Sequence, residues 1–382
     1  LGYVTILASR RYAPRQESHH YASQVKRMLA GRLRREGEKM KKPNQLKKGD
    51  VVAVLSPSWG GASIFPDVYQ NGINYLINEL GLKVKEFKTI KMDPQQIYEN
   101  PKLRAADINQ AFKDPEVKAI FSTIGGSDSI RILEYLDLKL IKKNPKIFMG
   151  FSDTTTILCY LNLKGLVTYY GNAIMAGFSY LSNFEEAQKE YESVLFSKNK
   201  YKLKPFSIWS DSYEPWGVKE NVGKVKNLYN VDIGFRWLQK SKKTTAKLYG
   251  GCIEVLTMMN GTFAWPKIGF WNDKYLFIET SEDKPSPEEV GFILRNFGVQ
   301  KIFYKIKGIL IAKPKDYSIE EKKKLDDEII KIVVGEFNCK HLNIVSNIEF
   351  GHTDPRHIMP LGIDLEIDPV LEKLEFIENL FE

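Results

Sequence analysis

The chain has 382 residues, of which 43% are hydrophobic and 12% aromatic. This composition is typical of globular proteins, and the length suffices for two domains with buried cores. A membrane-spanning helix needs about 18 to 20 consecutive apolar residues, and since no stretch approaches that length we expect no membrane partner. The three cysteines, Cys159, Cys252 and Cys339, form no CxxC pair. That argues against a disulfide scaffold or structural zinc site and favours a reducing, cytoplasmic location.

Basic charge is concentrated at the start of the chain. Residues 1–39 contribute +6 of the formal net charge of +9 and contain seven arginines, whereas residues 40–382 contain only five. The body therefore gives no support for nucleic-acid binding. Arginine usage changes near residue 40, and Met40 begins a segment that resembles the natural start of a protein. Both observations predict that residues 1–39 are a non-native or disordered basic leader. A genuine basic tail is the alternative.

Short apolar runs alternate with segments of helical spacing from about residue 48. The expected strands are 51–56, 82–87, 117–124, 147–150 and 166–170, and the expected helices are 67–80, 103–113, 129–136 and 153–163. This order predicts a doubly wound α/β domain with a mostly parallel sheet. We assign this N-terminal domain to residues 45–180.

The pattern weakens over residues 181–245, which we interpret as an inter-domain crossing with loops. A second α/β series then follows, with helices expected at 252–259, 286–297 and 318–334 and strands at 275–279, 308–313 and 342–347. This series predicts a smaller C-terminal α/β domain over residues 246–382.

Histidine is scarce enough to narrow the search for a general base. His19 and His20 lie in the leader, and His341 lies among polar residues in a setting typical of a surface. His352 follows a glycine at the lip of a loop, where a rigid sheet often positions catalytic groups. It is therefore the main candidate among the histidines.

The same loop leaves a metal site open as an alternative. His352, Asp354 and His357 form an H-x-D-x-x-H pattern. The spacing is not a helical i, i+4 pair, and Pro355 prevents a regular helix through it. We therefore expect no metal at this loop.

A glycine pair, Gly125 and Gly126, ends the strand expected at 117–124 and precedes Ser129. A sharp turn from strand to helix can present a serine hydroxyl, and free backbone N–H groups at the helix start can stabilise an oxyanion. Two other interpretations stay open from the residues alone. Ser127, Asp128 and Ser129 are good helix N-caps, and a glycine-rich turn can bind phosphate, although the usual phosphate-loop patterns are absent.

Glu279 ends the apolar strand expected at 275–279, where a carboxylate could orient the imidazole of a histidine. An exposed strand-end glutamate is the simpler interpretation. Glu282 and Asp283 are nearby competitors for the same role.

Taken together and in order, six motifs resemble the LD-carboxypeptidase family of serine peptidases over nearly the whole body. They are STIGGSDSIRIL at 122–133, IFMGFSDTT at 147–155, YGGCIEVL at 249–256, NGT at 260–262, LFIETSE at 276–282 and FGHTDP at 350–355. The residues of these motifs are more similar to those of the microcin C immunity branch than to those of the cell-wall recycling branch.

The resemblance implies a catalytic triad of Ser129, Glu279 and His352 at the interface of the two domains. Residues 45–180 would then be the N-terminal nucleophile domain, and residues 246–382 the C-terminal domain that carries the glutamate and the histidine. His352 would act as general base for Ser129, oriented by Glu279, in the hydrolysis of an amide through an acyl-enzyme, and this mechanism requires no metal and no organic cofactor. Gly126 and Ile130 are the candidate oxyanion-hole donors, through their backbone N–H groups.

Two substrate branches follow from the resemblance. The immunity branch implies cleavage of a peptidyl or acyl aminoacyl-nucleotide amide, and the recycling branch implies release of D-alanine from a muramoyl tetrapeptide in peptidoglycan recycling. Trp209, Trp216 and Trp237 are candidates to stack on a nucleobase, with ordinary packing as the alternative. Asn172 stands where the family pattern leads us to expect proline, which leaves its effect on specificity open. The family also implies a homodimer, and a non-catalytic nucleotide- or ligand-binding protein is the alternative from another class.

Overall fold

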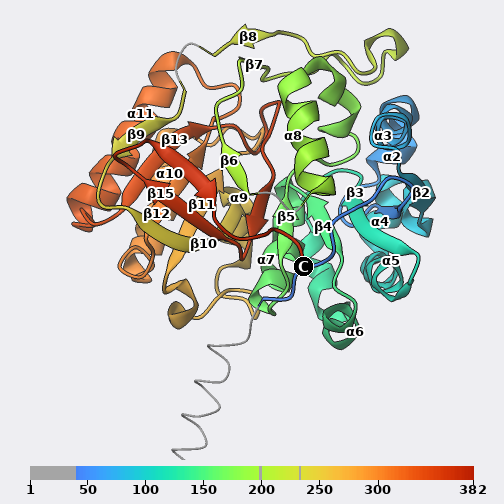
Figure 1. The fold of residues 1–382 in the computed structure, drawn as a ribbon, viewed down its shortest axis with the longest axis horizontal. Helices are drawn as coiled ribbons and strands as arrows, with labels where there is room; N and C mark the ends of the chain where they lie inside the picture. The colour runs from blue at the N-terminus through green and yellow to red at the C-terminus, as the bar shows by residue number, and fades with distance from the viewer. Residues whose placement is uncertain (1–39, 198–199, 232–233) are drawn as a thin grey trace, which may run out of the picture. The chain divides into compact units, whose positions relative to one another are not determined.

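A six-stranded sheet organises the first half of the protein in the computed structural model, which describes residues 40–197, 200–231 and 234–382 (Figure 1). Lys41–Glu382 form one compact unit and are described here by themselves. The predicted leader, residues 1–39, lies outside the described residues. The strand order is β14-β5-β4-β3-β1-β2. The strands are β1 (Val51–Leu55), β2 (Lys83–Glu86), β3 (Val117–Ser122), β4 (Ile147–Gly150), β5 (Thr168–Tyr170) and β14 (Met359–Leu361).

The first five of these strands are parallel, as the sequence predicts. Their helices include α2 (Gly61–Ile64), α3 (Pro66–Asn78), α4 (Pro94–Glu99), α5 (Pro101–Lys113), α6 (Leu138–Lys143) and α7 (Thr155–Leu163). Among the helices predicted for this domain, the segment after β3 differs from the prediction. It forms a 3₁₀ helix, η2 (Ser129–Tyr135), in place of an α-helix. The order β2-β1-β3 places a topological switch point between β1 and β3, where ligands of such sheets bind at the carboxyl ends of the strands.

An eight-stranded sheet organises the second half, in the order β6-β16-β15-β10-β11-β12-β13-β9. Its parallel centre is β10 (Thr244–Cys252), β11 (Lys274–Glu279), β12 (Gly308–Ala312) and β13 (Asn343–Ile348). Antiparallel strands complete it: β6 (Tyr201–Leu203), β9 (Arg236–Gln239), β15 (Asp364–Asp368) and β16 (Lys373–Phe376). The mixed α/β architecture in two domains is confirmed, but the second sheet has more strands than the first.

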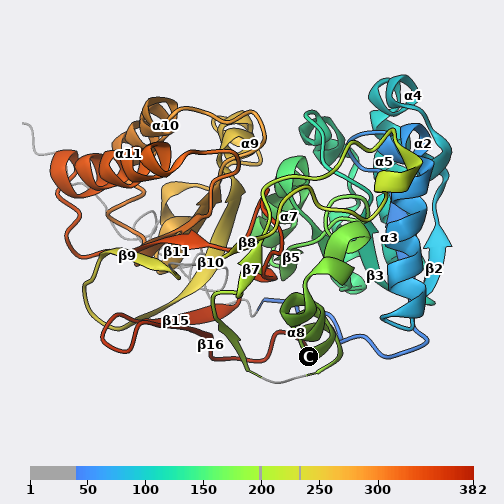
Figure 2. The ribbon, with the colours of Figure 1, turned by 90° about the horizontal axis from the view of Figure 1, so that it is seen from above.

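The helices of the second half are α9 (Ile253–Met259), α10 (Pro287–Val299) and α11 (Ile319–Ile330), and the last continues as a short π-helix, η7 (Lys331–Glu336). Helices α10 and α11 lie together beside the sheet in Figure 2. Both begin at capping boxes, Ser286 with Glu289 and Ser318 with Glu321, which satisfy the first free backbone N–H groups. These serine–glutamate pairs explain why the starts predicted from the sequence, at 286 and 318, lie within one residue of the observed starts.

The predicted crossing contains more regular structure than its weak pattern indicates. It holds α8 (Glu185–Phe196), the edge strands β6 and β9, and a short hairpin of β7 (Ile208–Trp209) and β8 (Tyr229–Asn230). In both ribbon views the segment that includes β7 and β8 reaches over to the side of α2 and α3 (Figures 1 and 2). There Trp216 meets Phe65 with ring centroids 5.4 Å apart. We call residues 207–231 the crossing loop.

Gly251 allows the domains to pack closely where β10 meets α7. Gly250 and Gly251 have φ values of +151° and +150°, and a Cβ on Gly251 would lie 2.6 Å from the Thr155 side chain. The Thr155 hydroxyl accepts a 3.2 Å hydrogen bond from the Cys252 N–H. A larger residue at Gly251 would collide with Thr155 of the other domain, whereas one at Gly250 would collide with the Phe277 backbone of the neighbouring strand β11. Both positions also need a backbone that L side chains rarely adopt.

Candidate active site

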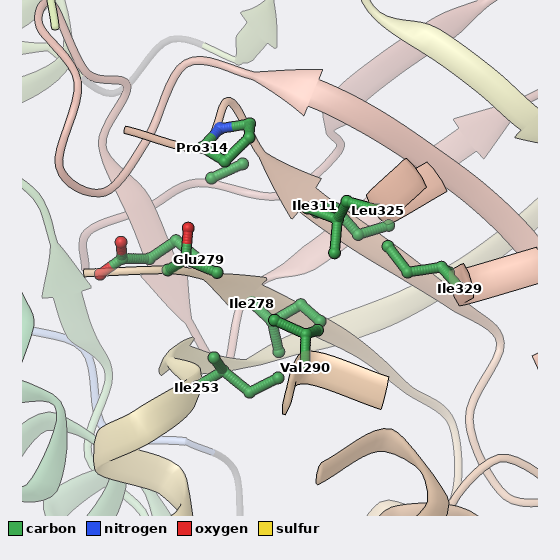
Figure 3. A pocket seen from close by; sticks show the side chains of 10 residues that line it. Ile253, Ile278, Glu279, Val290, Ile311, Pro314, Leu325 and Ile329 are labelled. Carbon is green, nitrogen blue, oxygen red and sulfur yellow. The ribbon is translucent and has the colours of Figure 1, made fainter. Parts of the chain in front are cut away.

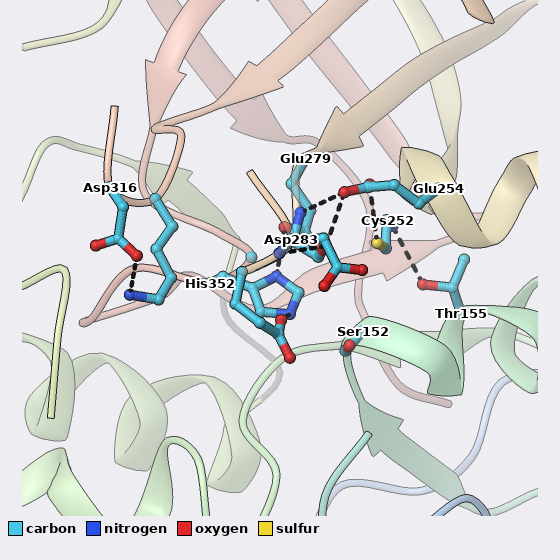
Figure 4. Close-up of polar contacts among 12 residues, drawn as sticks. Ser152, Thr155, Cys252, Glu254, Glu279, Asp283, Asp316 and His352 are labelled. Atoms are coloured by element: carbon cyan, nitrogen blue, oxygen red, sulfur yellow. Dashed lines mark hydrogen bonds and ion pairs between the residues drawn. The ribbon is translucent and has the colours of Figure 1, made fainter. Parts of the chain in front are cut away.

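A cavity of about 550 Å³ lies at the carboxyl ends of β1, β3 and β4, at the switch point of the first sheet. The first domain lines it with turn residues that include Trp59, Gly125, Gly126 and Ser152. The second domain contributes Glu282 and His352, from the loops after β11 and β13. Figure 4 shows Ser152 on the turn before α7 and His352 across from it. The predicted position of the site, at the interface of the two domains, agrees with this geometry.

Glu279 and His352 form a buried pair at this interface. The Glu279 Oε2 lies 2.7 Å from the His352 Nδ1, and both side chains are almost fully buried. The other carboxylate oxygen of Glu279 accepts a hydrogen bond from the Tyr170 hydroxyl. A carboxylate held in this way fixes the orientation of an imidazole and stabilises its charged form. The structure therefore brings together two of the three residues expected from the sequence.

The pair depends on a glycine next to the histidine. Gly351 has a φ of +90°, and a Cβ there would lie 2.5 Å from the Glu279 Oε2. Glycine is required both by this backbone conformation and by the close approach of the carboxylate.

The electrostatic setting of His352 favours its protonated form. Burial by itself would lower the pKa of this imidazole, but the nearby Glu279 and Glu282 carboxylates more than compensate and raise the pKa to about 10. Glu282 contacts the second ring nitrogen, with 2.8 Å between Oε2 and Nε2. The hydrogen bond to His352 lowers the pKa of Glu282 to about 2.

Glu279 lies next to tightly packed apolar side chains of the second domain. Behind it, apolar side chains from β11, β12, α10 and α11 surround a cavity of only about 10 Å³, which is about the space of one water probe. Figure 3 shows the Glu279 carboxylate directed away from Ile311 and Leu325. The strand end that carries the carboxylate is thus packed against core on one side and faces His352 on the other.

Ser129 is not brought to this pair. Its side chain is fully buried, and its hydroxyl donates a 2.7 Å hydrogen bond to the Asp153 carbonyl and contacts the Thr156 hydroxyl. Its backbone N–H donates to the Asp153 Oδ2 at 2.8 Å. The expectation that this hydroxyl faces His352 therefore needs correction. Because η2 turns the Ser129 side chain inward, the residue supports the turn that contains Asp153.

Ser152 occupies the position that the sequence led us to expect for Ser129. It follows β4 and precedes α7 with a φ of +57°, a backbone conformation that is rare for serine and typical of a sharp strand-to-helix turn. A Cβ on Gly125 would lie 2.7 Å from the Ser152 Cβ, so a glycine there leaves room for the serine. The Ser152 N–H donates to the Tyr170 hydroxyl, which in turn bonds Glu279.

A sequence signal for Ser152 exists in the motif at 147–155. Gly150 and Ser152 stand two residues apart directly after an apolar strand, which is the first half of the G-x-S-x-G nucleophile elbow. The second glycine of that pattern is missing, since Thr154 occupies its place. The sequence predicts the helix that follows this serine but does not distinguish the serine itself as a nucleophile.

Of the two residues expected to supply oxyanion-hole N–H groups, one lines the cavity and the other does not. Gly126 lines the cavity beside Ser152, with a φ of +158°. Ile130 does not appear among the described residues that line the cavity, and it lies within η2. The N–H of Asp153, the residue after Ser152, takes its place as a candidate, since elbow serines commonly share an oxyanion hole with the next residue.

Of the three tryptophans expected to contact substrate, only Trp216 lines the cavity. Trp209 packs against Tyr229 and lies under the ammonium groups of Lys313 and Lys322. Trp237 belongs to β9, next to Lys240. Neither Trp209 nor Trp237 borders the cavity in the described part of the chain, so packing explains both.

The three residues of the H-x-D-x-x-H pattern point to different partners. His352 contacts Glu279, whereas Asp354 binds Tyr213 and Arg356, and His357 binds Glu190. Among residues 40–197, 200–231 and 234–382, no group of three or more His, Cys, Asp or Glu side chains is placed to hold a metal ion. The three side chains of the pattern therefore do not converge on one site among the described residues.

Asn172 is buried beside the loop of His352. Its Oδ1 accepts a 3.2 Å hydrogen bond from Arg356, and its N–H donates to the Tyr191 hydroxyl. Arg356 also donates to the carbonyls of Gly351 and Ala176. Asn172 is thus linked to the histidine loop through one arginine and does not itself line the cavity.

Comparison with known proteins identifies the family. Residues 52–171 match the LD-carboxypeptidase N-terminal domain, and residues 245–367 match the LD-carboxypeptidase C-terminal domain. The chain belongs to the LD-carboxypeptidase family. It is a serine-type carboxypeptidase, as the resemblance predicts, and in the described ranges no helix is long and apolar enough to cross a membrane.

Relatives of this LD-carboxypeptidase cover most of its length. The microcin C7 self-immunity protein MccF of Escherichia coli is 27% identical over 84% of this chain and 91% of its own. A carboxypeptidase homologue of Synechocystis is 30% identical over 88% of this chain and 97% of its own. The structure of MccF in complex with glutamyl sulfamoyl guanosine has a TM-score of 0.79 at 26% identity and covers 89% of this chain and 99% of that one.

Proposed function

We propose that Ser152, His352 and Glu279 form the catalytic triad of this carboxypeptidase. The observation that carries the proposal is the junction at the domain interface. A strained serine on a strand-to-helix turn lines the same cavity as an imidazole whose Nδ1 is bonded to a buried carboxylate. Ser152 replaces Ser129 in this assignment, and Glu279 and His352 keep the roles expected from the sequence.

In the proposed mechanism His352 removes the proton from the Ser152 hydroxyl through Nε2 as the serine oxygen attacks an amide carbonyl. The resulting oxyanion is stabilised by the N–H groups of Gly126 and Asp153. The imidazolium then gives its proton to the leaving nitrogen, and the C–N bond breaks to leave an acyl-enzyme. Water, activated by the same imidazole, hydrolyses the ester and restores the serine.

We further propose a substrate of the microcin C immunity type, in which the amide joins an acyl or peptidyl group to an aminoacyl-nucleotide. Trp216 lines the cavity with Trp59 and Tyr213, and these rings offer a surface on which a nucleobase can stack. Solved MccF structures contain aspartyl sulfamoyl adenosine and glutamyl sulfamoyl guanosine, and an MccF-like protein of Streptococcus pneumoniae contains AMP. The cavity volume of about 550 Å³ is adequate for a ligand of that size.

A muramoyl tetrapeptide is the second candidate substrate. A Bacillus subtilis protein named as a murein peptide carboxypeptidase is 37% identical, though over only 34% of this chain. This identity is higher than that of MccF but covers a much smaller part of the chain. The homodimer and the cytoplasmic location expected from the family stay predictions.

The test is a mass-spectrometric hydrolysis assay with both substrates on the wild type and on Ser152→Ala and Trp216→Ala. We expect serine-dependent release of an aminoacyl-sulfamoyl adenosine from its N-acylated form, and a KM at least about tenfold higher in Trp216→Ala. Trp237→Ala is the matched control, because this tryptophan lies away from the cavity. Serine-dependent loss of D-alanine alone would assign the recycling branch, and full activity in Ser152→Ala would refute the triad.

A further inference from the structure

The Nε2 atom of His352 is already occupied in the resting protein. Glu282 Oε2 lies 2.8 Å from it, while Glu279 Oε2 lies 2.7 Å from Nδ1. A carboxylate only accepts hydrogen bonds, so two carboxylates at the two nitrogens require an N–H at each of them. An imidazole with two N–H groups is the charged form, and it has no lone pair with which to take a proton from Ser152.

The groups around the imidazole come from several elements. Glu279 ends β11, Glu282 and Asp283 belong to the loop after β11, Lys315 comes from the loop after β12, Phe151 precedes Ser152, and Arg356 follows His352. Phe151 packs edge-on against the ring at 5.0 Å, and the Arg356 guanidinium lies over Phe151 at 4.2 Å. The two carboxylates in direct contact outweigh the more distant cations Lys315 and Arg356, which accords with the raised pKa of His352.

Glu279 and Glu282 differ in how firmly they are held. The Glu279 side chain is 1% exposed and is also bonded by Tyr170, whereas the Glu282 side chain is 63% exposed. The backbone beside Glu282 is nevertheless fixed, because the N–H and the hydroxyl of Ser281 both donate to Glu254 Oε1, at 2.9 and 2.7 Å. Glu282 can therefore leave Nε2 by rotating its own side chain, with no movement of the loop.

We propose that Glu282 is a displaceable carboxylate that holds His352 in its doubly protonated form until substrate enters the cavity. The proposal rests on the proposed triad. Substrate enters the cavity that Glu282 lines, and displacement of Glu282 removes the bond that requires the second N–H. The Nε2 proton then leaves to solvent, and Ser152 meets a neutral imidazole. Glu282 is a positioning residue in this scheme, since it acts through His352.

The first test measures the imidazole itself, without substrate. Histidine side chains labelled with ¹³C and ¹⁵N are titrated by NMR in the wild type, Glu282→Gln and Asp283→Asn, with His352→Gln used to assign the signal. We expect Glu282→Gln to lower the titration midpoint of His352 by about one pH unit or more, as removal of an adjacent opposite charge does. Asp283→Asn removes the same charge from the same loop without breaking the contact, so its effect on the midpoint should be clearly smaller.

The second test uses the pH dependence of hydrolysis. The profile of kcat/KM reports the free enzyme and that of kcat reports the substrate complex. We expect Glu282→Gln to move the acid limb of kcat/KM to lower pH and to leave the acid limb of kcat in place. On that limb kcat/KM should rise about tenfold for every pH unit by which the limb moves. Glu282 is exposed, so Glu282→Ala offers a second variant that should fold equally well.

The outcomes separate this proposal from the triad. An unchanged NMR midpoint in Glu282→Gln, or an equal change in Asp283→Asn, would overturn the role of Glu282 while leaving the triad intact. Equal movement of the kcat and kcat/KM profiles would also overturn it, because Glu282 would then remain in place with substrate bound. Full activity in Ser152→Ala would instead reject the triad, and the NMR titration would still report on Glu282.

Discussion

The Ser129 hydroxyl donates a hydrogen bond of 2.7 Å to the main-chain carbonyl of Asp153, the residue that follows Ser152. The Asp153 carboxylate in turn accepts hydrogen bonds from the Ser129 N–H and the Ser58 hydroxyl. The turn that strains Ser152 is thus tied to the two loops that follow β1 and β3. This bracing holds the serine in a conformation that it would not adopt by itself.

The two serines should therefore respond differently to removal of the hydroxyl. We expect Ser152→Ala to lower kcat by at least about a thousandfold with unchanged stability, because the attacking atom is lost. We expect Ser129→Ala to lower the free energy of unfolding by about 1 to 3 kcal/mol, because buried partners lose their hydrogen bond, and to retain measurable turnover. Urea denaturation and steady-state kinetics on the same preparations check both, and inactive but fully stable Ser129→Ala would contradict this assignment.

Gly351 provides a way to disturb the Glu279–His352 pair without changing either residue. A methyl group at Gly351 would meet the Glu279 carboxylate, so we expect Gly351→Ala to lose about a thousandfold or more in kcat. Gly165→Ala is the matched control, since Gly165 has a similar φ of +95° but open space around its Cβ position. The control should lose only about 1 kcal/mol of stability and keep its activity. Equal kinetic effects of the two substitutions would show that backbone strain alone is responsible.

The paired imidazole should also make stability depend on pH. The pKa of His352 is about 10 in the folded protein and about 6.5 in an unfolded chain. The folded state therefore binds the proton more tightly, so this contribution is fully present below about pH 6.5 and is lost as pH rises to about 10. We expect the stability advantage of the wild type over His352→Gln to shrink between about pH 6 and about pH 10 in urea titrations. An advantage that grows over this range would contradict the ion-pair description.

The crossing loop is anchored to the histidine loop, which predicts a residue that affects binding more than turnover. Ser210 and Asp354 exchange backbone hydrogen bonds of 2.6 and 2.8 Å, and the Tyr213 hydroxyl binds the Asp354 side chain. We expect Tyr213→Phe to keep its stack on Tyr180 but to raise KM about tenfold, because Trp216 loses its fixed position, with little change in kcat. Tyr229→Phe, on the same loop but away from the cavity, is the control and should leave KM unchanged.

The regular elements were largely predictable because their sequences are locally consistent. The strand at 147–150 was predicted with its observed bounds, and α10 begins within a residue of the prediction, since Ser286, Pro287 and Glu289 mark its start. The helix α8 was missed although Ala187, Tyr191, Val194 and Leu195 have helical spacing and lie buried, because it begins a segment whose pattern otherwise weakens. The strands β6, β9 and β14 were missed because each is short and gains its hydrogen-bond partners from distant parts of the chain.

The site was predictable in part for a similar reason. Glu279 and His352 each end or follow an apolar strand in sequence, and parallel strands bring their carboxyl ends to one edge. The choice between Ser129 and Ser152 depended on which hydroxyl turns outward. That orientation is set by η2 and by the positive φ of Ser152, neither of which has a distinct residue pattern. Likewise, no local signal distinguishes Trp216 from Trp209 and Trp237.

The strand β14 belongs by sequence to the second half of the protein but pairs with β5 in the first sheet, Met359 opposite Tyr170. The described strands thus pass from one large sheet to the other three times, between β5 and β6, on entering β14 and again on leaving it for β15. We expect neither half to fold as an independent module, because a fragment with the first half alone lacks an edge strand and one with the second half alone carries that strand without a sheet to join. We also expect this threading to resist hinge opening, so that substrates enter through movement of side chains and loops and not through separation of the domains.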